Sequence, residues 1–513
     1  MSGTHPSSLN AARRARELAE LPRESPVDVL VIGGGVTGTG VALDAASRGL
    51  SVVLAEKHDV AFGTSRWSSK LVHGGLRYLA SGSVGIAHES AVERGILLTR
   101  TAPHLVRPLP QLVPLLPRVS GSAAALVRAG FAAGDLLRLS ARTSHQSLPR
   151  SRRVTRAEVQ RLAPTVRAEG LRGGLLGWDG QLTDDARLVV ALARTAAAHG
   201  ARVLTRCAAE DVTGGGAVLR DQLTGEATQV DARMVVNATG VWAGGLAPGV
   251  SLRPSRGTHL VLPREAFGEL ASGLMTPVPG ERNRFVFALP ASDDRVYVGL
   301  TDEETSGEIP DVPRASESEI DFLLETISTA LRAPLTRRDV LGTYSGLRPL
   351  LDSGNGRSAD VSREHAVLTA PDGLVTVVGG KLTTYRRMAE DALDAALARS
   401  GVMAGPCRTR RLPLVGAGNR AELAGVDAPD RLVRRYGTEA AAVLDGAACE
   451  PGAAEPIADG IPVTRAELLF GLRHEGALDE SDLVDRRTRI GLSTADRERA
   501  LPAVTETLGR VRV

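Results

Sequence analysis

Residues 27–56 read VDVLVIGGGVTGTGVALDAASRGLSVVLAE. The segment Val27–Ile32 is rich in β-branched residues and predicts a buried strand. Gly33, Gly35 and Gly38 follow it with G-x-G-x-x-G spacing. Glycines at these positions permit a tight turn, close approach of the backbone to a pyrophosphate, and close packing of the next helix. The order of strand, glycine turn and helix therefore predicts a dinucleotide-binding unit.

The end of this stretch supports the same prediction. Gly49 is expected to end the helix, and Ser51–Ala55 predicts a second strand with Glu56 at its tip, where a carboxylate can accept hydrogen bonds from a ribose. A pyrophosphate would lie at the helix N-terminus, where free N–H groups favour an anion. The alternative is an ordinary glycine-rich turn in a chain with 56 glycines, with Glu56 as a surface charge.

Composition narrows the class of protein. The net charge of +3 is close to balance for 513 residues, so nucleic-acid binding is not indicated. Cys207, Cys407 and Cys449 are too widely spaced to predict disulfides or a metal site, and they suit a reducing cytoplasm. No apolar run approaches the ~20 residues of a membrane span. Residues 11–21 predict a solvated helix rather than a signal peptide.

A second glycine turn occurs far along the chain. The apolar strand Leu374–Val378 is followed by Gly379 and Gly380 and then by a helix with one apolar face. A further strand, Arg233–Asn237, runs into Gly240 and is expected to return the chain to the first sheet. Two glycine turns onto helices in one chain suit a long cofactor that is held at both ends.

The remaining segments predict two more domains. Residues 257–263, 284–290 and 295–301 resemble antiparallel strands of a second sheet. We expect a discontinuous dinucleotide domain of residues 27–100, 185–248 and 340–402, a substrate domain of residues 101–184 and 249–339, a helical C-terminal domain of residues 403–513, and an N-terminal extension of residues 1–26. The predicted fold class is α/β, with a Rossmann-like domain, an antiparallel-sheet domain and a helical domain.

Longer motifs resemble those of the FAD-dependent glycerol-3-phosphate dehydrogenases, the flavoprotein branch related to D-amino-acid oxidase. From Val31 to about Ile490 they are, in family order, VIGGGVTGTGVALDAASRG, SSKLVHGGLRYL, DDARLV, VNATGVWAG, RGTHLVLP, YSGLRPL, GGKLTTYR and RHEGALDESDLVDRRTRI. SSKLVHGGLRYL and GGKLTTYR are far more specific than the glycine fingerprint. The Ala-rich region 118–140 and the N-terminal extension depart from the family pattern.

The resemblance implies tightly bound FAD, oxidation of sn-glycerol 3-phosphate to dihydroxyacetone phosphate, and electron delivery to a membrane quinone. No cysteine or histidine lies in an evident flavin-attachment motif, so we expect the FAD to be non-covalent. It also implies a cytoplasmic enzyme that is peripheral on the inner face of the cell membrane, with a homodimer as one option. The glycine fingerprint alone does not distinguish FAD from NAD. The second turn at Gly379–Gly380 favours FAD, because a helix N-terminus there can face the isoalloxazine ring.

Arginines in two motifs are the candidate phosphate anchors. Arg77 in HGGLRYL and Arg348 in YSGLRPL are suited to this role, since a guanidinium offers phosphate two parallel donors. Tyr78 can add a hydrogen bond, or it can be a packed aromatic. For any single arginine the alternative is a surface salt bridge, and it is the motif position that favours the substrate.

His259 in RGTHLVLP is the leading candidate for the general base, because the ordinary pKa of histidine lies near working pH. A structural histidine is the alternative, and His73 is the rival, although it is expected to pack near the flavin. Lys381 follows the second glycine turn, where a cation can stabilise a developing alkoxide or the substrate phosphate. Catalytic roles are thus assigned to His259, Lys381 and Arg348.

The remaining candidates surround the cofactor. The predicted cofactor-binding residues are Gly33, Gly35, Gly38, Glu56, Thr64, Ser65, Ser69, His73, Gly240, Gly380, Leu382 and Thr383. Asp184, Asp185 and Arg187 are expected to lock domains together, while Thr301 and Asp302 line the substrate side or form a turn.

Two points stay open at this stage. An oxidase that passes electrons to oxygen and makes hydrogen peroxide would carry the same motifs, and a flavin-binding protein without turnover is a lesser alternative. Residues 122–139 predict a helix with Arg128 and Arg138 on its polar side. The two alternatives for this helix are packing in the core and contact with a membrane surface.

Overall fold

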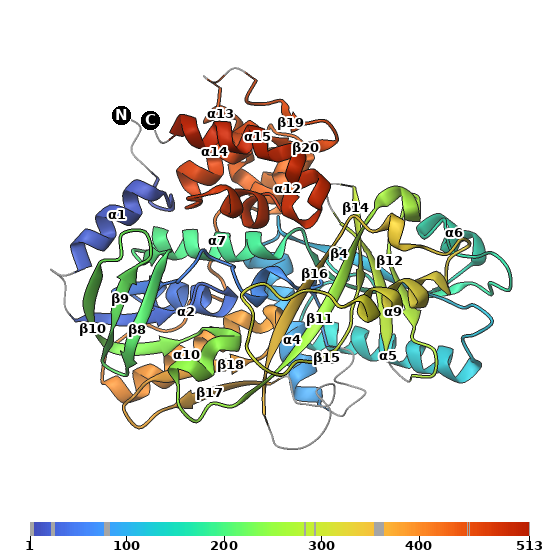
Figure 1. Cartoon of the computed structure of the whole chain (residues 1–513). Coiled ribbons are helices and arrows are strands. Elements are labelled where there is room, and N and C mark those ends of the chain that lie inside the picture. Colours follow the sequence, from blue (N-terminus) through green and yellow to red (C-terminus); the bar gives the residue numbers. More distant parts are fainter. Residues whose placement is uncertain are drawn as a thin grey trace.

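The computed structural model describes residues 5–21, 26–75, 83–281, 284–291, 294–352, 364–448, 450 and 452–511. In this part of the chain two large sheets lie side by side, and a mainly helical C-terminal region lies above helix α7 (Asp185–Ala198) (Figure 1). This arrangement confirms the predicted α/β class. None of the helices in these ranges is both long and apolar enough to cross a bilayer.

The first sheet has the Rossmann-like arrangement that the glycine fingerprint predicted. Its main path runs β17-β18-β10-β1-β2-β7, and the pairs from β18 to β7 are parallel. The strands are β1 (Val27–Ile32), β2 (Val52–Ala55), β7 (Arg202–Leu204), β8 (Cys207–Thr213), β9 (Gly216–Asp221), β10 (Ala227–Asn237), β17 (His365–Thr369) and β18 (Val375–Gly379). The hairpin β8–β9 adds to β10 and is antiparallel to it.

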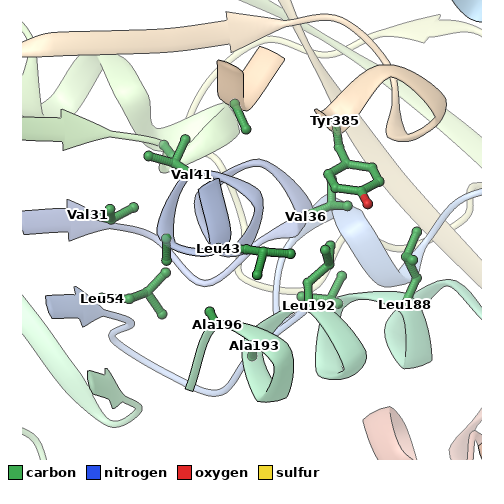
Figure 2. Packing of buried hydrophobic residues seen from close by; sticks show 14 of the residues in the cluster. Val31, Val36, Val41, Leu43, Leu54, Leu188, Leu192, Ala193, Ala196 and Tyr385 are labelled. Atoms are coloured by element: carbon green, nitrogen blue, oxygen red, sulfur yellow. The ribbon is translucent and has the colours of Figure 1, made fainter. Parts of the chain in front are cut away.

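Burial on both faces explains why β1 is a continuous apolar run. Val29 and Val31 face the helices α2 (Val36–Ser47), α7 and α10 (Tyr385–Ser400), whereas Leu30 and Ile32 join a second cluster with β8, β9 and β10. Figure 2 shows the helix side, where side chains of α2 lie between those of α7 and Tyr385 of α10. This packing holds the glycine turn at the start of α2.

The second sheet is mixed, where the sequence predicted an antiparallel one. Its path is β15-β11-β14-β13-β12-β4-β6-β3, with β16 on β11 and β5 on β6, and the β4–β12 pair is parallel. The strands are β3 (Leu71–Val72), β4 (Val106–Pro114), β5 (Arg152–Val154), β6 (Gly174–Leu182), β11 (Leu252–Pro263), β12 (Gly273–Pro277), β13 (Phe285–Pro290), β14 (Arg295–Gly299), β15 (Glu303–Glu304) and β16 (Gly342–Leu351).

Two strands from segments that were predicted to belong to the dinucleotide domain lie in the second sheet instead. β3 falls in segment 27–100 and β16 in segment 340–402, yet both belong to the second sheet. β16 pairs with β11 along ten residues, and the edge pairing of β3 with β6 likewise fixes its position. Both strands therefore carry residues of the motifs SSKLVHGGLRYL and YSGLRPL into the second sheet.

The other helices before the C-terminal region include α4 (Val84–Ile96), α5 (Gly121–Ser140), α6 (Arg156–Leu162), α8 (Ala243–Leu246) and α9 (Glu317–Ser328). On the second sheet, α9 packs across β11, β12, β13 and β14, and α5 packs on β6. In α5 the side chains of Phe131 and Leu137 are buried, while Leu126, Leu136 and Leu139 are 50%, 68% and 56% exposed. The prediction that Arg138 lies on the polar side is wrong, because it is buried and donates to the carbonyl of Thr143.

The C-terminal region consists of α11 (Arg420–Ala424), α12 (Asp430–Tyr436), α13 (Ala440–Asp445), α14 (Arg465–His474) and α15 (Thr494–Val511), with the small strand pair β19 (Pro456–Ala458) and β20 (Ile461–Thr464). Ion pairs link this region to α7: Arg187 binds Glu475, and Asp184 lies 3.5 Å from Arg435. These contacts agree with the predicted locking role. The N-terminal helix α1 (Ala11–Glu20) is not simply solvated, since Arg14 is buried against Asp221.

Candidate functional site

The parallel strands of the first sheet end at one cavity. Its volume is about 1020 Å³, and its walls include residues at the carboxyl ends of β1, β2, β10 and β18. Ligands of open α/β sheets bind at these ends, because the loops and helix N-termini there present backbone N–H groups. The cavity continues along the second sheet to β11 and β16. Residues of both sheets therefore line one cavity.

The first glycine turn lines this cavity. Gly33 has a positive φ of 107°, and Gly35 is the N-cap of α2. The N–H group of Val36 donates to Ser65 Oγ at 2.9 Å, so Ser65 lies directly at this helix N-terminus. Gly38 is not in the cavity wall; a Cβ atom there would collide with the carbonyl of Gly33. Gly38 thus serves the close packing of helix on turn.

Glu56 lies beside the same turn. It lines the cavity, and its carboxylate accepts hydrogen bonds from the N–H groups of Gly34 at 2.6 Å and His58 at 2.8 Å. Burial raises the pKa of Glu56, and these backbone donors oppose that rise. The alternative of a surface charge is therefore wrong. Each carboxylate oxygen keeps a further lone pair for a ligand hydroxyl.

The second glycine turn lines the same cavity. Gly379 and Gly380 have φ values of 77° and 68°, and the helical turn Leu382–Thr384 follows them before α10. Lys381 is the N-cap of that turn, and its Nζ donates to Ser90 Oγ at 2.8 Å. Both glycine turns thus meet one cavity, as expected for an elongated cofactor.

Other predicted cofactor residues are placed between these turns. The cavity walls include Thr64, Ser69, His73, Gly240, Leu382 and Thr383. Thr64 Oγ1 donates to the carbonyl of Leu347 at 2.6 Å, which ties this loop to β16. A Cβ atom at Gly240 would meet no atom within 4 Å, so this position is open.

His259 is held by a serine and a tyrosine. On β11 it lines the cavity, is 2% exposed, and lies 2.8 Å through Nε2 from Ser69 Oγ. Its ring stacks on Tyr344 of β16 with centroids 4.7 Å apart. Among the described residues no hydrogen-bonding group reaches Nδ1. The pairing with Ser69 and the role of Tyr344 could not be found from the local sequence.

Burial, together with nearby cations, keeps the imidazole of His259 neutral. Burial lowers the pKa of His259 well below 6.5; Lys70 and Arg348 lower it further, while Asp185 opposes them. Lys70 is itself buried, with Nζ 4.3 Å from the centroid of the Tyr344 ring and 3.1 Å from Asp185. Burial lowers the pKa of Lys70 to about 8, although Asp185 opposes the shift. A neutral imidazole can accept a proton.

The Arg348 guanidinium lies against Gly257, because this glycine leaves room for it. A Cβ atom at Gly257 would collide with the Arg348 guanidinium. Arg348 lines the cavity and donates to Asp302 Oδ1 at 3.1 Å and to Ser255 Oγ at 3.3 Å. Thr301 and Asp302 line the same wall, which agrees with one of the two expectations for them. The guanidinium is therefore an oriented cation rather than a solvated surface charge.

The two other candidate substrate residues, Arg77 and Tyr78, lie outside the described residues. The nearby His73 is in the cavity wall, in agreement with its expected position near the cofactor.

An apolar part of the cavity was not predicted. Its walls include Val127 and Phe131 of α5 together with Met275, Phe285 and Phe287 of β12 and β13. Sequence periodicity identified the apolar stripe of α5 but not the surface it covers. The pairing of β4 with β12 determines which surface α5 covers, because it brings β12 and β13 under this helix.

Two family models match the chain. Residues 28–386 match the model for FAD dependent oxidoreductases, and residues 407–512 match the C-terminal domain of alpha-glycerophosphate oxidase. Glycerol-3-phosphate dehydrogenase 1 of Mycobacterium bovis is 58% identical over 513 residues, with 99% of each chain covered. The chain belongs to the FAD-dependent glycerol-3-phosphate dehydrogenase family.

Solved structures of related proteins agree with this family. The glycerol-3-phosphate dehydrogenase of Bacillus halodurans complexed with FAD superposes with a TM-score of 0.74 at 28% identity, covering 98% of this chain and 94% of that one. The FAD-bound L-alpha-glycerophosphate oxidase of Mycoplasma pneumoniae has a TM-score of 0.57 at 17% identity, over 76% of this chain and 99% of that one, and shares the fold alone.

FAD is the cofactor of this family, and the cavity fits it. Two glycine turns, one acidic residue at a strand end and a helix N-terminus line one elongated space, as an extended dinucleotide requires. The residues suited to hold it are those at the first turn, Glu56 and the second turn. When bound, FAD supplies the hydride acceptor.

Proposed function

We propose that this protein oxidises sn-glycerol 3-phosphate to dihydroxyacetone phosphate and passes the electrons to a membrane quinone. The observation that carries the proposal is the convergence of His259, Arg348 and Lys381 on one FAD-sized cavity. Oxidation of a secondary alcohol removes a hydride from carbon and a proton from oxygen. A phosphorylated alcohol further needs a cation that holds the phosphate away from the reacting carbon.

His259 takes the hydroxyl proton. Its lowered pKa leaves the imidazole neutral at working pH, and its stacking on Tyr344 restricts the ring. Nδ1 is buried, whereas Nε2 lies 2.8 Å from Ser69 Oγ, which also lines the cavity. When the Ser69 hydroxyl donates to Nε2, the substrate proton reaches this nitrogen through the serine. The substrate carbon loses its hydride as this proton leaves, and the product is a ketone.

Arg348 and Lys381 bind the charged parts of the substrate. Arg348 offers N–H groups in a planar fork that matches phosphate, and Asp302 and Ser255 hold this fork in place. Lys381 follows the second glycine turn, where an ammonium group stabilises negative charge on the substrate oxygen as the proton leaves. In the proposed site Arg77 and Tyr78 assist in phosphate binding.

The apolar part of the cavity supports a quinone as the electron acceptor. Apolar pockets with few polar groups favour flat, lipid-soluble ligands. Helix α5 lines this part and also exposes Leu136 and Leu139. Residues 118–150 contain five arginines and a single acidic residue, Asp135, which suits contact with anionic headgroups. We infer that α5 meets the membrane surface and that quinone enters beside it.

Anaerobic mixing of the purified flavoprotein with glycerol 3-phosphate tests the reaction. We expect rapid bleaching of the flavin absorbance, no comparable bleaching with glycerol, and rapid recovery of the absorbance on adding a short-chain quinone. Absence of bleaching would overturn the proposed substrate. Bleaching with equal speed by glycerol would overturn the role of the phosphate anchors.

Reoxidation by air separates the dehydrogenase from the oxidase. The C-terminal family model is named for an oxidase, so this alternative has a specific observation in its favour. Slow reoxidation in air with rapid reoxidation by quinone supports the dehydrogenase. Rapid reoxidation in air with stoichiometric hydrogen peroxide would assign the oxidase instead.

A further inference from the structure

A short segment of the C-terminal region contacts the loop that follows Glu56. Asp59 in this loop is fully buried, and it accepts bonds from Arg486 Nε at 2.6 Å and from the two terminal nitrogens of Arg487 at 2.7 and 2.9 Å. Both arginines belong to the helical segment Asp482–Arg487. Asp59 is 427 positions from Arg486 and 428 positions from Arg487 in the sequence.

The paired charges hold Asp59 ionised. Burial alone would raise the pKa of Asp59, but the guanidiniums of Arg487 and Arg486 outweigh this effect and lower it. Arg487 also donates through Nε and NH2 to the carbonyl of Glu475, at 3.1 and 2.7 Å. Removing one partner of such a buried ion pair strongly destabilises the fold, because the other partner is left as an unpaired buried charge.

The same loop is held at a second point. The backbone N–H of Arg206 donates to the carbonyl of His58 at 2.7 Å, and the Arg206 side chain binds Asp479 and Asp482 at 2.6 and 2.7 Å. Asp482 in turn binds Arg486. The segment from Glu56 to Asp59 is therefore fixed on both sides by groups that contact the C-terminal region.

This loop also lines the cofactor cavity. Glu56 and His58 line it, and the ring of His58 stacks on Phe62, also in the wall, with centroids 3.8 Å apart. The N–H of His58 donates to Glu56 Oε1, so a shift of the loop would reorient that carboxylate. Neither Arg486 nor Arg487 is among the described residues that line the cavity.

We propose that Arg486 and Arg487 are positioning residues for FAD, and that the C-terminal region controls how tightly the enzyme retains its cofactor through Asp59. The proposal rests on FAD as the cofactor and is independent of the substrate. Its tests therefore use FAD retention, measured without glycerol 3-phosphate, so they can fail or succeed separately from the proposed reaction.

The first test compares FAD release from holoenzyme variants. After dilution, the fluorescence of released FAD should rise on the order of tenfold faster for Asp59→Asn and Arg487→Gln than for the wild type, as expected for the loss of charge-assisted bonds. The double variant should release FAD no faster than the faster single variant, since both changes break the same contact.

Arg431→Gln is the matched control. Arg431 is half-buried and binds the fully buried Glu467 within the C-terminal region, so the change breaks an arginine–carboxylate pair away from the loop. We expect a lowered melting temperature with FAD release within about twofold of the wild type. Equal release rates for Arg431→Gln, Asp59→Asn and Arg487→Gln would overturn the proposal and leave only a general loss of stability.

The second test needs no substitution and decides the question if the variants do not fold. Binding is reciprocal, so FAD should stabilise the segment that positions its loop. Adding FAD to the stripped full-length chain should slow amide hydrogen exchange in residues 482–489 and 56–62, and leave α11 unchanged. Slower exchange at residues 33–40 with no change at 482–489 would overturn the proposal.

Discussion

His259 depends on residues from three separate parts of the chain. β11 carries it, Tyr344 of β16 stacks on it, and Ser69 from the loop after the first glycine unit lies within hydrogen-bonding distance. A histidine in a predicted strand gave no sign of these partners. Their combined effect is to hold a neutral ring in a cavity wall, which favours a base over a structural histidine.

Replacing His259 tests this role. His259→Gln should lower the limiting rate of flavin reduction by about 10²–10⁴-fold and leave FAD content nearly unchanged. Because the pKa of His259 in the fold lies below 6.5, the wild-type base becomes protonated only as the pH falls below that value. The acidic limb of the reduction rate at saturating substrate should vanish in the variant. A limb that persists unchanged, with near-normal reduction, would move the role to Lys381, His73 or water.

A substitution at Arg348 tests whether this residue binds the substrate phosphate. Arg348→Lys keeps the charge but loses the planar fork and its bonds to Asp302 and Ser255. Binding of glycerol 3-phosphate should weaken by about 1.5–3 kcal/mol, the range for a charge-assisted hydrogen bond. Substrate titration of the flavin spectrum measures it. Unchanged affinity would assign Arg348 to a purely structural pair with Asp302.

At the scale of elements, the periodicity of apolar residues predicted that α5 is a helix but not which of its side chains are buried. The sequence predicted a helix over residues 122–139, and the structure has Gly121–Ser140. Period alone did not show that Phe131 turns inward, since the apolar stripe extends over more than one side of the helix. The sheet under α5 decides which apolar residues it covers and leaves Leu136 and Leu139 exposed.

These exposed leucines give a test of membrane contact. Leu136→Ser combined with Leu139→Ser should weaken binding to vesicles that contain anionic lipid, because an interfacial helix binds through apolar area as well as charge. Leu223→Ser, at another exposed leucine, is the control. Binding should also fall as salt rises. Full binding by the folded double variant would move the membrane face to another surface. Phe131 is unsuitable for this test because it is buried.

At the scale of the whole molecule, one cavity joins both sheets, and the C-terminal region contacts its loops. This region was predicted as helical and without obvious chemistry. Its helical segment Asp482–Arg487 binds Asp59, and Arg489 lies 3.7 Å from both Asp184 and Asp185. The described residues of this region do not line the cavity, yet they contact the loops that form its wall.

The cofactor should be held without a covalent bond. Acid precipitation of the purified protein should release all of its flavin, and free FAD should raise the melting temperature of the stripped chain. A ligand at roughly 100 times its Kd stabilises the folded state by about 2.7 kcal/mol. Flavin that stays in the acid pellet would contradict this expectation, and a stripped chain with an unchanged melting temperature would contradict FAD binding.

The sequence by itself determined the dinucleotide-binding unit, because strand, glycine turn, helix and acidic tip are encoded within residues 27–56 and depend on local conformation. The second glycine turn, the antiparallel strands and the family motifs were also readable locally. The residues expected around the cofactor, apart from Gly38, therefore occur in one cavity wall.

The tertiary structure alone decided what depends on distant contacts. The placement of β16 on β11, the Ser69–His259 pair 190 residues apart, and the Asp59–Arg487 pair 428 residues apart arise when separate elements pack. Local sequence carries no information on such partners, since a hydrogen bond or ion pair requires only that two groups meet in space. The inward turn of Phe131 has the same origin, because the surface under α5 is built by strands from elsewhere in the chain.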